Sequence, residues 1–403
     1  MTDGLESFRA VSYPWRLYSG VDALDQLPTE VARHGARRAF VICGQTVAHR
    51  TNLLARLRDR LGAVCGGVFD RMDKDSSYAA VVAATDAARA AGADLIIAVG
   101  GGSVIVGARV TAILLGEKGD PFALMTQYPE SQAPVSPRLM APKLPIVNVP
   151  TTPTTAMNRA GSGLRNDQLD HRMEFFDPKT RPVALFWDAE ALLTAPLSLA
   201  RSAGTTTFTA CIHAVSAGSA NPLVDGDYRQ AFRLAGNALP RMVASPGDAA
   251  PRIDLCAAAF LLNRAADDGA TREGRDRASS AAYALATALH VRYDHVGQGE
   301  ATSAVTPTAV RMLGAEPGAR RMAEALGAAP GEMAPDAAAA TAADALAASY
   351  RALGMPARVR DLGIPEGELG LVARDTLKNF NANRGARAAD HVDRMLELLR
   401  ACW

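Results

Sequence analysis

The feature that most constrains this fold is a change of hydrophobic periodicity near residue 195. Up to that point, short apolar runs alternate with helical patterns. Strands are predicted at AFVIC (39–43), AVCGGVF (63–69), DLIIAVG (94–100), LPIVNV (144–149) and PVALFW (182–187), with helices at 51–61 and 78–93 and a hairpin within 159–180. Strands that alternate with helices predict a parallel sheet covered on both faces. Beyond residue 195 only Ala- and Leu-rich helical patterns continue, so we predict an all-helical second domain.

The composition and the net charge of the chain limit which kinds of binding partner we expect. The chain of 403 residues is 48% hydrophobic with a net charge of +1, which indicates globular domains and gives no reason to expect nucleic acid or a membrane as partner. No run approaches the roughly 20 apolar residues that a membrane span needs, and MTDGLESFRA at the start lacks the pattern of a secretory signal. The five cysteines form no CxxC pair, which favours reduced thiols in a cytoplasmic protein.

A strand, three glycines and a helix follow one another in AVGGGSVIVGARV (98–110). Glycines let the backbone approach a phosphate closely, and a helix N-terminus offers N–H donors. Ser103 suits the N-cap of that helix. The motif is neither GxGxxG nor a Walker loop, and a tight turn without a ligand is the alternative. Because ligands collect at the carboxyl ends of parallel strands, we predict a phosphate-binding turn at Gly100, Gly101, Gly102 and Ser103.

Two further segments offer polar side chains. PTTPTT (150–155) follows a predicted strand and presents hydroxyls on a proline-stiffened turn, a pattern that is also common on plain surfaces. TTTFTACIHAVSA (205–217), taken as a helix, places Thr206, Ala210 and His213 on one stripe at i, i+4 and i+7. Such a stripe can aim its side chains into a cleft.

These motifs resemble those of the iron-containing (group III) alcohol dehydrogenases, relatives of glycerol dehydrogenase and dehydroquinate synthase. The family motif GGGSxxDxAK is matched by GGGSVIVGAR, and PTTAGTGSE is matched by PTTPTTAMN. YPWRLYSG near the start, RPVALFWDAEALLTAP at the predicted domain junction and the C-terminal segment extend the resemblance over nearly the whole chain. It implies a Rossmann-like domain at 1–195, a helical domain at 196–403, a nicotinamide dinucleotide in the cleft between them, and a homodimer or higher assembly.

The resemblance also assigns cofactor residues. Residues 100–103 would hold the pyrophosphate, and the walls on the nicotinamide and adenine sides would be lined by Thr151, Thr152 and Thr155. Arg172 stands where many members have a lysine, so a basic group near the cofactor is retained.

The turn CGQTVAHR after the first predicted strand bears on the choice of cofactor. Gly44 stands where the family often has an aspartate for the ribose diol. Without that carboxylate a 2′-phosphate is not repelled, and Gln45, Thr46 or Arg50 could hold it. We therefore favour NADP over NAD.

The positions that hold the metal in this family are substituted. The resemblance puts one aspartate and three histidines at the metal, and the corresponding residues are Thr206, Ala210, Tyr283 (or, after a one-residue gap, Ala284) and Gln298. These side chains cannot replace a carboxylate and three imidazoles around a divalent cation. Val106 and Asn158 replace two acidic residues of the loop motifs. We therefore expect no catalytic metal in the usual place.

Three interpretations of the histidines stay open. His213 lies on the stripe described above, and His290 lies on a second one with Tyr283 and Thr287. The rings are satisfied by local hydrogen bonds, or one of them protonates the carbonyl oxygen in place of the metal, or they form a relocated metal site. As proton donors we place His213 and His290 before His295; Tyr283 is a further candidate donor, with buried core as its alternative.

The expected function is a metal-independent NAD(P)H-dependent alcohol dehydrogenase or carbonyl reductase acting on a small or medium organic aldehyde or ketone. The alternative is a non-redox descendant of the same fold, which catalyses an elimination, cyclisation or isomerisation, or a ligand-binding pseudoenzyme. Binding of a dinucleotide distinguishes the two.

Overall fold

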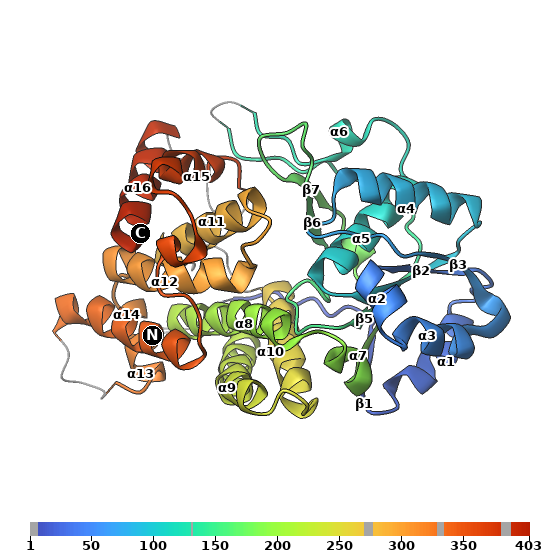
Figure 1. Cartoon of the computed structure of the whole chain (residues 1–403), viewed down its shortest axis with the longest axis horizontal. Helices are drawn as coiled ribbons and strands as arrows, with labels where there is room; N and C mark the ends of the chain where they lie inside the picture. The colour runs from blue at the N-terminus through green and yellow to red at the C-terminus, as the bar shows by residue number, and fades with distance from the viewer. Residues whose placement is uncertain (1–6, 130–131, 270–276, 329–333, 380–387) are drawn as a thin grey trace. The chain divides into compact units, whose positions relative to one another are not determined.

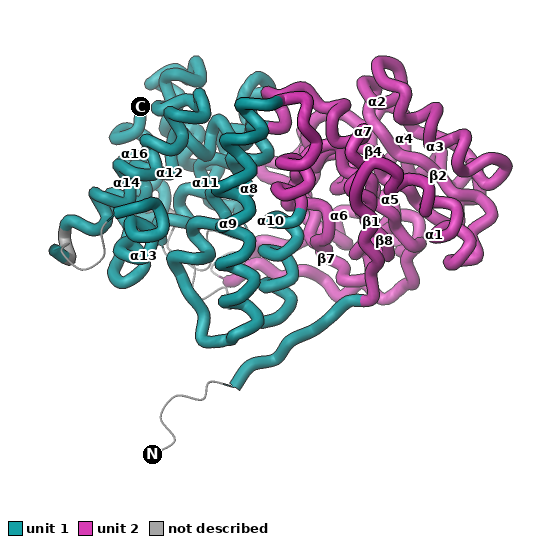
Figure 2. The backbone as a smooth tube through the Cα atoms, turned by 90° about the horizontal axis from the view of Figure 1, so that it is seen from below, with its two compact units in different colours: residues 1–13, 201–245, 257–403 teal, residues 14–200, 246–256 magenta. Residues whose placement is uncertain are grey.

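The structure is a computed structural model that describes residues 7–129, 132–269, 277–328, 334–379 and 388–403. Contacts within the chain divide it into two compact units (Figure 2). The sheet unit comprises residues 14–200 and 246–256, and the helical unit comprises residues 1–13, 201–245 and 257–403. One boundary lies inside helix α8 (Leu197–Ala217). The predicted domain limits, 1–195 and 196–403, stay a prediction.

The sheet unit is built on six parallel strands in the order β1-β8-β5-β4-β2-β3. The strands are β1 (Arg16–Gly20), β2 (Ala39–Cys43), β3 (Cys65–Phe69), β4 (Leu95–Gly100), β5 (Ile146–Pro150) and β8 (Ala184–Asp188). The helices are α1 (Leu27–Arg33), α2 (Gln45–Arg50), α3 (Leu53–Leu61), α4 (Tyr78–Ala90), α5 (Gly102–Gly116), α6 (Pro121–Leu124) and α7 (Ala189–Leu193). Figure 1 shows the sheet between α4 and α5 on one side and α1 and α3 on the other.

Burial explains why the central strands are continuous apolar runs. Every residue of β2, β4, β5 and β8 is buried, as expected for parallel strands with helices on both faces. Alternate residues such as Val41 and Ile97 pack with Leu27 of α1 and with Leu53 and Leu57 of α3. The predicted parallel sheet is therefore confirmed, with each predicted strand present within a residue or two.

Several short elements of the sheet unit were not predicted, among them strand β1 and helices α1, α2, α6 and α7. β1 is a five-residue edge strand with no fully buried position, so its sequence RLYSG shows no apolar run. The segment predicted as a turn after β2 forms the short helix α2, whose N-cap is Gly44.

The polar stretch between β5 and β8 contains the predicted hairpin. Strands β6 (Gly161–Leu164) and β7 (Met173–Phe176) pair antiparallel as a separate two-stranded sheet. The segment 120–143 is rich in proline, a pattern that predicts a surface position, but it is partly buried, because Met125, Thr126 and Leu139 are less than a tenth exposed. That expectation is therefore wrong in part.

The helical unit has no strand among its described residues. After α8 come α9 (Pro222–Ala244), α10 (Ala250–Asp267, which begins in the sheet unit), α11 (Arg277–Arg292), α12 (Gln298–Leu313), α13 (Gly318–Ala325), α14 (Pro335–Ala352), α15 (Leu369–Asp375) and α16 (Ala388–Cys402). One core cluster joins α11, α12, α15 and α16 through residues such as Leu285, Val305, Val372 and Leu398. The predicted all-helical region after residue 195 is confirmed for the described residues.

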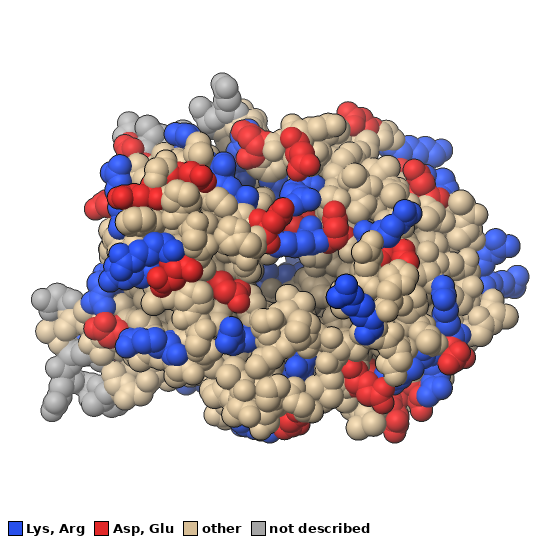
Figure 3. All heavy atoms as spheres, in the orientation of Figure 1, with Lys and Arg blue, Asp and Glu red and all other residues tan. Residues whose placement is uncertain are grey.

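The distribution of charged side chains and the properties of the helices agree with the composition of the sequence. On the face shown in Figure 3, acidic and basic side chains are interspersed within each unit. Among the described residues, no helix is both long and apolar enough to cross a membrane.

Candidate functional site

The two predicted cofactor loops lie side by side at the carboxyl ends of adjacent strands β4 and β5. The Thr151 amide donates a hydrogen bond to the Gly100 carbonyl oxygen over 3.0 Å. A Cβ on Gly101 would lie 3.3 Å from Thr152 Oγ1, and a Cβ on Gly102 would lie 3.0 Å from Thr154 Oγ1. The glycines therefore keep a side-chain-free surface directly beside threonine hydroxyls. A diphosphate fits such a cradle, which pairs close backbone approach with the N-terminus of the 15-residue helix α5.

Ser103 is not the N-cap of α5, which corrects its predicted position. Gly101 occupies the N-cap, and Ser103 lies inside the first turn. Its side chain binds a different segment: the Asp75 amide donates to Ser103 Oγ over 2.9 Å, and Ser76 Oγ donates to the Ser103 carbonyl oxygen over 2.5 Å. The serine therefore connects α5 to the loop that precedes α4.

Arg172 is placed beside the same loop. It directly precedes β7, and its Nη2 forms an ion pair with Asp75 Oδ1. Asp75 in turn contacts Ser103 through its amide. The predicted basic group and the predicted phosphate-binding turn are thus joined through a single aspartate that the sequence gave no reason to select.

The turn after β2 lies near the end of β3. The Met72 amide donates to the Cys43 carbonyl oxygen over 3.1 Å, and a Cβ on Gly44 would lie 3.1 Å from the Met72 carbonyl oxygen. Gln45 and Thr46 are exposed at the start of α2. This edge therefore offers a glycine surface with two solvent-facing polar side chains, and their contact with a ribose or phosphate stays a prediction.

The loop that contains the threonines is fixed by two buried side chains. Arg109 of α5 donates through Nη1 to the carbonyl oxygens of Arg159 and Gly161, both over 2.7 Å. Asn148 of β5 donates through Nδ2 to the Met157 carbonyl oxygen over 2.7 Å. Burial lowers the pKa of the Arg109 guanidinium to about 9. The structure therefore uses Arg109, at the lysine position of the family's glycine motif, to position the second loop.

In the helical unit, the stripe predicted on α8 is the less buried face of that helix. Thr206, Ala210 and His213 are half-buried, whereas positions 204, 205, 207–209, 211 and 212 are buried. Thr206 Oγ1 donates to the Ser202 carbonyl oxygen over 3.1 Å, so its proton is used within the helix. Thr206 therefore presents lone pairs to this face.

Gln298 lies at the start of a helix that is hydrogen-bonded to α8. It is the first residue of α12, and the next amide, that of Gly299, donates to Ser202 Oγ over 2.9 Å. Ser202 Oγ donates to Glu300 Oε2 over 2.5 Å. Ser202, one turn before Thr206, therefore links α8 to the first turn of α12, the helix that begins at Gln298.

The other candidate donors lie on and after α11. His290 Nδ1 is 2.8 Å from the Val296 carbonyl oxygen, and His295 Nε2 is 2.9 Å from the Leu362 carbonyl oxygen. Tyr283 is 38% exposed, so its interpretation as a buried core residue is wrong. Thr287, predicted on the stripe between Tyr283 and His290, is buried. His290 and His295 thus make local hydrogen bonds, as the first of the three interpretations expects. A catalytic role for His290, His295 or Tyr283 stays a prediction.

The side chains at the four assigned metal positions do not fit a divalent cation. They are a hydroxyl, a methyl group, a phenol and an amide, without carboxylate or imidazole. Among the described residues, no group of three or more His, Cys, Asp or Glu is arranged to hold a metal ion.

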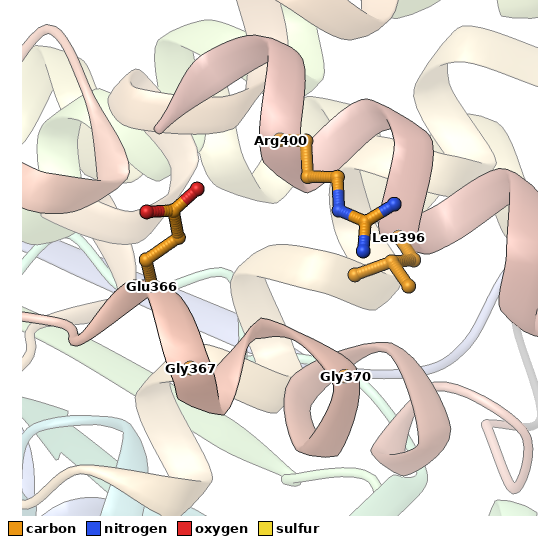
Figure 4. A pocket seen from close by; sticks show the side chains of 5 residues that line it. All are labelled: Glu366, Gly367, Gly370, Leu396 and Arg400. Carbon is orange, nitrogen blue, oxygen red and sulfur yellow. The ribbon is translucent and has the colours of Figure 1, made fainter.

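A shallow pocket lies elsewhere in the helical unit. It is lined by Glu366, Gly367, Gly370, Leu396 and Arg400, and Figure 4 shows Glu366 and Arg400 on opposite sides of it. None of the predicted site residues lines it.

Sequence reasoning missed four residues that organise these sites. Thr154 lay in the noted PTTPTT turn but was not selected, and Arg109 was visible as the basic residue of the glycine motif. Asp75 and Ser202 gave no signal, because each acts through a partner distant in sequence.

Comparison with known proteins gives consistent matches. An iron-containing alcohol dehydrogenase model matches residues 14–189, and the C-terminal model of the Fe-containing alcohol dehydrogenase family matches residues 202–403. Maleylacetate reductase 2 of Cupriavidus pinatubonensis (strain JMP 134 / LMG 1197) is 29% identical over 261 residues, 65% of this chain and 64% of that protein. Lactaldehyde reductase of Escherichia coli (strain K12) is 24% identical over 390 residues, 95% of this chain and 97% of that protein.

The fold has close neighbours among solved structures. A crystal structure of 1,3-propanediol oxidoreductase superimposes with a TM-score of 0.82 at 21% identity, covering 99% of this chain and 100% of that one. At this identity the likeness shows the fold.

Proposed function

This chain belongs to the iron-containing alcohol dehydrogenase family, and from that premise we propose that it is a metal-independent NADPH-dependent carbonyl reductase. Family membership makes it a nicotinamide-dependent oxidoreductase of CH–OH and C=O groups. The finer proposal names a small or medium aldehyde or ketone as substrate, NADPH ahead of NADH as reductant, and a cytoplasmic homodimer as the working form. Two relatives named as reductases, of maleylacetate and of lactaldehyde, support the direction of the reaction.

One observation supports the cofactor part most strongly. The glycine turn of α5 and the threonine loop after β5 are joined by the 3.0 Å hydrogen bond from the Thr151 amide to the Gly100 carbonyl oxygen, and Arg172 is ion-paired to a residue that contacts Ser103. These residues would hold the diphosphate and the nicotinamide side of the dinucleotide. The bound nicotinamide supplies a hydride to the carbonyl carbon.

The remaining requirement is a proton for the carbonyl oxygen. Hydride addition places negative charge on that oxygen, which must be met by a hydrogen-bond donor or a Lewis acid. The donor set at the assigned metal positions does not favour a cation, and we propose that a side chain supplies the proton instead. His213, on the less buried stripe of α8, and His290 are the candidates, with Tyr283 after them. Gln298, the first residue of α12, offers an amide N–H that can bind the same oxygen.

The test uses purified protein stripped of metal by a strong chelator, with residual metal measured by mass spectrometry. NADPH oxidation is followed with a panel of aldehydes and ketones. We expect turnover that is unchanged by the chelator and by added Zn²⁺ or Fe²⁺. Turnover that appears only when a divalent cation is added would overturn metal independence.

The same preparation tests the alternative function. We expect NADPH to raise the thermal unfolding midpoint more than NADH does. If neither dinucleotide shifts the midpoint, the non-redox alternative replaces this proposal.

A further inference from the structure

Two consecutive residues before α4 adopt an unusual backbone conformation. Asp75 and Ser76 have φ angles of 63° and 52°, and they are the only described non-glycine residues with positive φ. Left-handed backbone is unfavourable for residues with a Cβ, although aspartate tolerates it better than most. Asp75 is 8% exposed and Ser76 is fully buried. Strain of this kind persists only where the surrounding contacts hold it, and it concentrates at functional sites.

The contacts that hold this segment come from the predicted cofactor site. The Asp75 amide donates to Ser103 Oγ over 2.9 Å, and Ser76 Oγ donates to the Ser103 carbonyl oxygen over 2.5 Å. From the other side, the Arg165 amide donates to the Asp75 carbonyl oxygen over 3.1 Å. The segment is therefore fixed between the first turn of α5 and the loop that follows β6.

The Asp75 carboxylate contributes an ion pair between its Oδ1 and Nη2 of Arg172. Arg172 is 22% exposed at its side chain, so its guanidinium is partly shielded from water. Residue 75 thus contacts Ser103 through its main chain and Arg172 through its side chain.

We propose that Asp75 is a positioning residue for dinucleotide binding, which orients the Ser103 hydroxyl and the Arg172 guanidinium toward the cofactor diphosphate. The proposal rests on the proposed function, because it assumes that the glycine turn binds a dinucleotide.

The chemistry of the two contacts gives the reason. Ser103 Oγ accepts from the Asp75 amide, so its own proton is left for another acceptor, such as a phosphate oxygen. A guanidinium paired on one side with a carboxylate has N–H groups left on its other edge, held in a fixed direction. The carboxylate therefore reduces the freedom of Arg172 before the cofactor arrives.

A positioning role and a simple charge effect predict opposite changes in the Kd for the dinucleotide when the negative charge of Asp75 is removed. If Asp75 acted only by its negative charge, or by competing with phosphate for Arg172, removing the charge would strengthen the binding of an anionic dinucleotide. If Asp75 positions Arg172, removing the charge weakens binding despite the lost repulsion. The direction of the change in Kd therefore decides between them.

The experiment measures Kd for NADPH by fluorescence titration and by calorimetry, independently of turnover. Asp75→Asn keeps a side chain that tolerates left-handed backbone, and Asp75→Gly removes the side chain and the strain together. We expect about a tenfold higher Kd in both variants, with thermal midpoints close to the native value. In a background of Arg172→Met, which itself weakens binding, Asp75→Asn should change Kd less than twofold, because its partner is already absent.

The control is Asp86→Asn, which breaks an exposed aspartate–arginine pair on α4 with Arg89. It should leave Kd unchanged. If the native chain binds NADPH and Asp75→Asn binds it equally or more tightly, the positioning role is wrong and the proposed function stands. If the native chain binds no dinucleotide, the proposed function fails, and this inference fails with it.

Discussion

At the scale of single residues, Gly44 is the position that bears most on cofactor choice. A carboxylate there would face a 2′-phosphate with like charge, whereas it would accept hydrogen bonds from an unphosphorylated ribose. A Cβ on Gly44 lies 3.1 Å from the Met72 carbonyl oxygen, so any side chain requires a small shift of that loop. Asp and Asn require the same shift and differ mainly in charge.

We therefore predict that Gly44→Asp raises the KM for NADPH about tenfold, which corresponds to about 1.4 kcal/mol, and lowers the KM for NADH. Gly44→Asn should raise the KM for NADPH less than threefold. Steady-state kinetics with both cofactors measure this. Equal effects of the two substitutions would show that the shift of the loop, and not charge, is responsible.

Residue-scale prediction from sequence was limited by contacts between distant segments. The glycine turn and the threonine turn were visible because each motif is contiguous. Only the N-cap position expected for Ser103 is wrong, because Gly101 is the N-cap and the Ser103 hydroxyl accepts from Asp75, 28 residues away. The positive φ of Asp75 has only a weak sequence signature, since aspartate tolerates left-handed backbone better than most residues, and the positive φ of Ser76 has none.

At the scale of elements, a buried ion-pair cluster joins the end of α5 to the loops before β5 and β8. Lys143 Nζ lies 2.7 Å from Glu117 Oε1 and 3.1 Å from Asp177 Oδ2, and its side chain is fully buried. The hydrogen bond from Lys143 lowers the pKa of the Glu117 carboxyl. Sequence patterns placed residues 120–143 at the surface, because proline-rich polar segments usually lie there.

Removing the buried ammonium group of Lys143 should lower the stability of the fold. We predict that Lys143→Met lowers the free energy of unfolding by about 3–5 kcal/mol, because it removes the buried cation from Glu117 and leaves Asp177 with only the more exposed Lys179. The matched control is Lys179→Met, since Lys179 also pairs with Asp177 but is 41% exposed. It should cost less than about 1 kcal/mol. Urea unfolding followed by circular dichroism measures both, and similar losses would contradict the argument from burial.

The packing of α16 against the end of α15 depends on pH through His391. Thr376 Oγ1 donates to the Ala373 carbonyl oxygen, so it accepts from His391 Nε2 over 2.9 Å. Burial, with a smaller contribution from Arg394, lowers the pKa of His391 below its ordinary value of 6.5. Below that pH the unfolded chain takes up a proton that the folded chain resists. The contribution of neutral His391 to the stability of the fold is therefore fully present above pH 6.5, and it is lost as the pH falls through the lowered pKa.

We predict that His391→Gln lowers the free energy of unfolding by about 1 kcal/mol at pH 7.5, the value of one hydrogen bond. Between pH 7.5 and 5 this difference should shrink, because the variant has no group to protonate. Trp403 fluorescence, with Trp15 and Trp187 replaced by Phe, reports on the helical unit, which contains both Trp403 and His391. A variant that loses as much stability as its parent over this pH range would contradict the assignment.

At the scale of the whole molecule, the two predicted parts of the site are divided between the two units. The predicted cofactor residues, from Gly44 to Arg172, all belong to the sheet unit. The predicted substrate and proton-donor residues, from Thr206 to Gln298, all belong to the helical unit. Periodicity predicted the two parts of the chain, because the strand signal ends near residue 195, and the family resemblance assigned the site residues within each part. The finer boundary could not be read, because it falls within the continuous helix α8, where the periodicity does not change.

This division predicts where a dinucleotide stabilises the protein when no substrate is present. A ligand that binds only the native state at about 100 times its Kd adds about 2.7 kcal/mol of stability. Most of this added stability should lie in the sheet unit. NADPH should therefore slow amide hydrogen exchange most in peptides covering 95–116 and 146–165. Peptides covering 388–402, in the core of the helical unit, should exchange at nearly their unliganded rate. Protection confined to the helical unit would place the dinucleotide elsewhere, because the N–H groups of α5 and the threonine loop belong to the sheet unit and would be the ones ordered by a bound diphosphate.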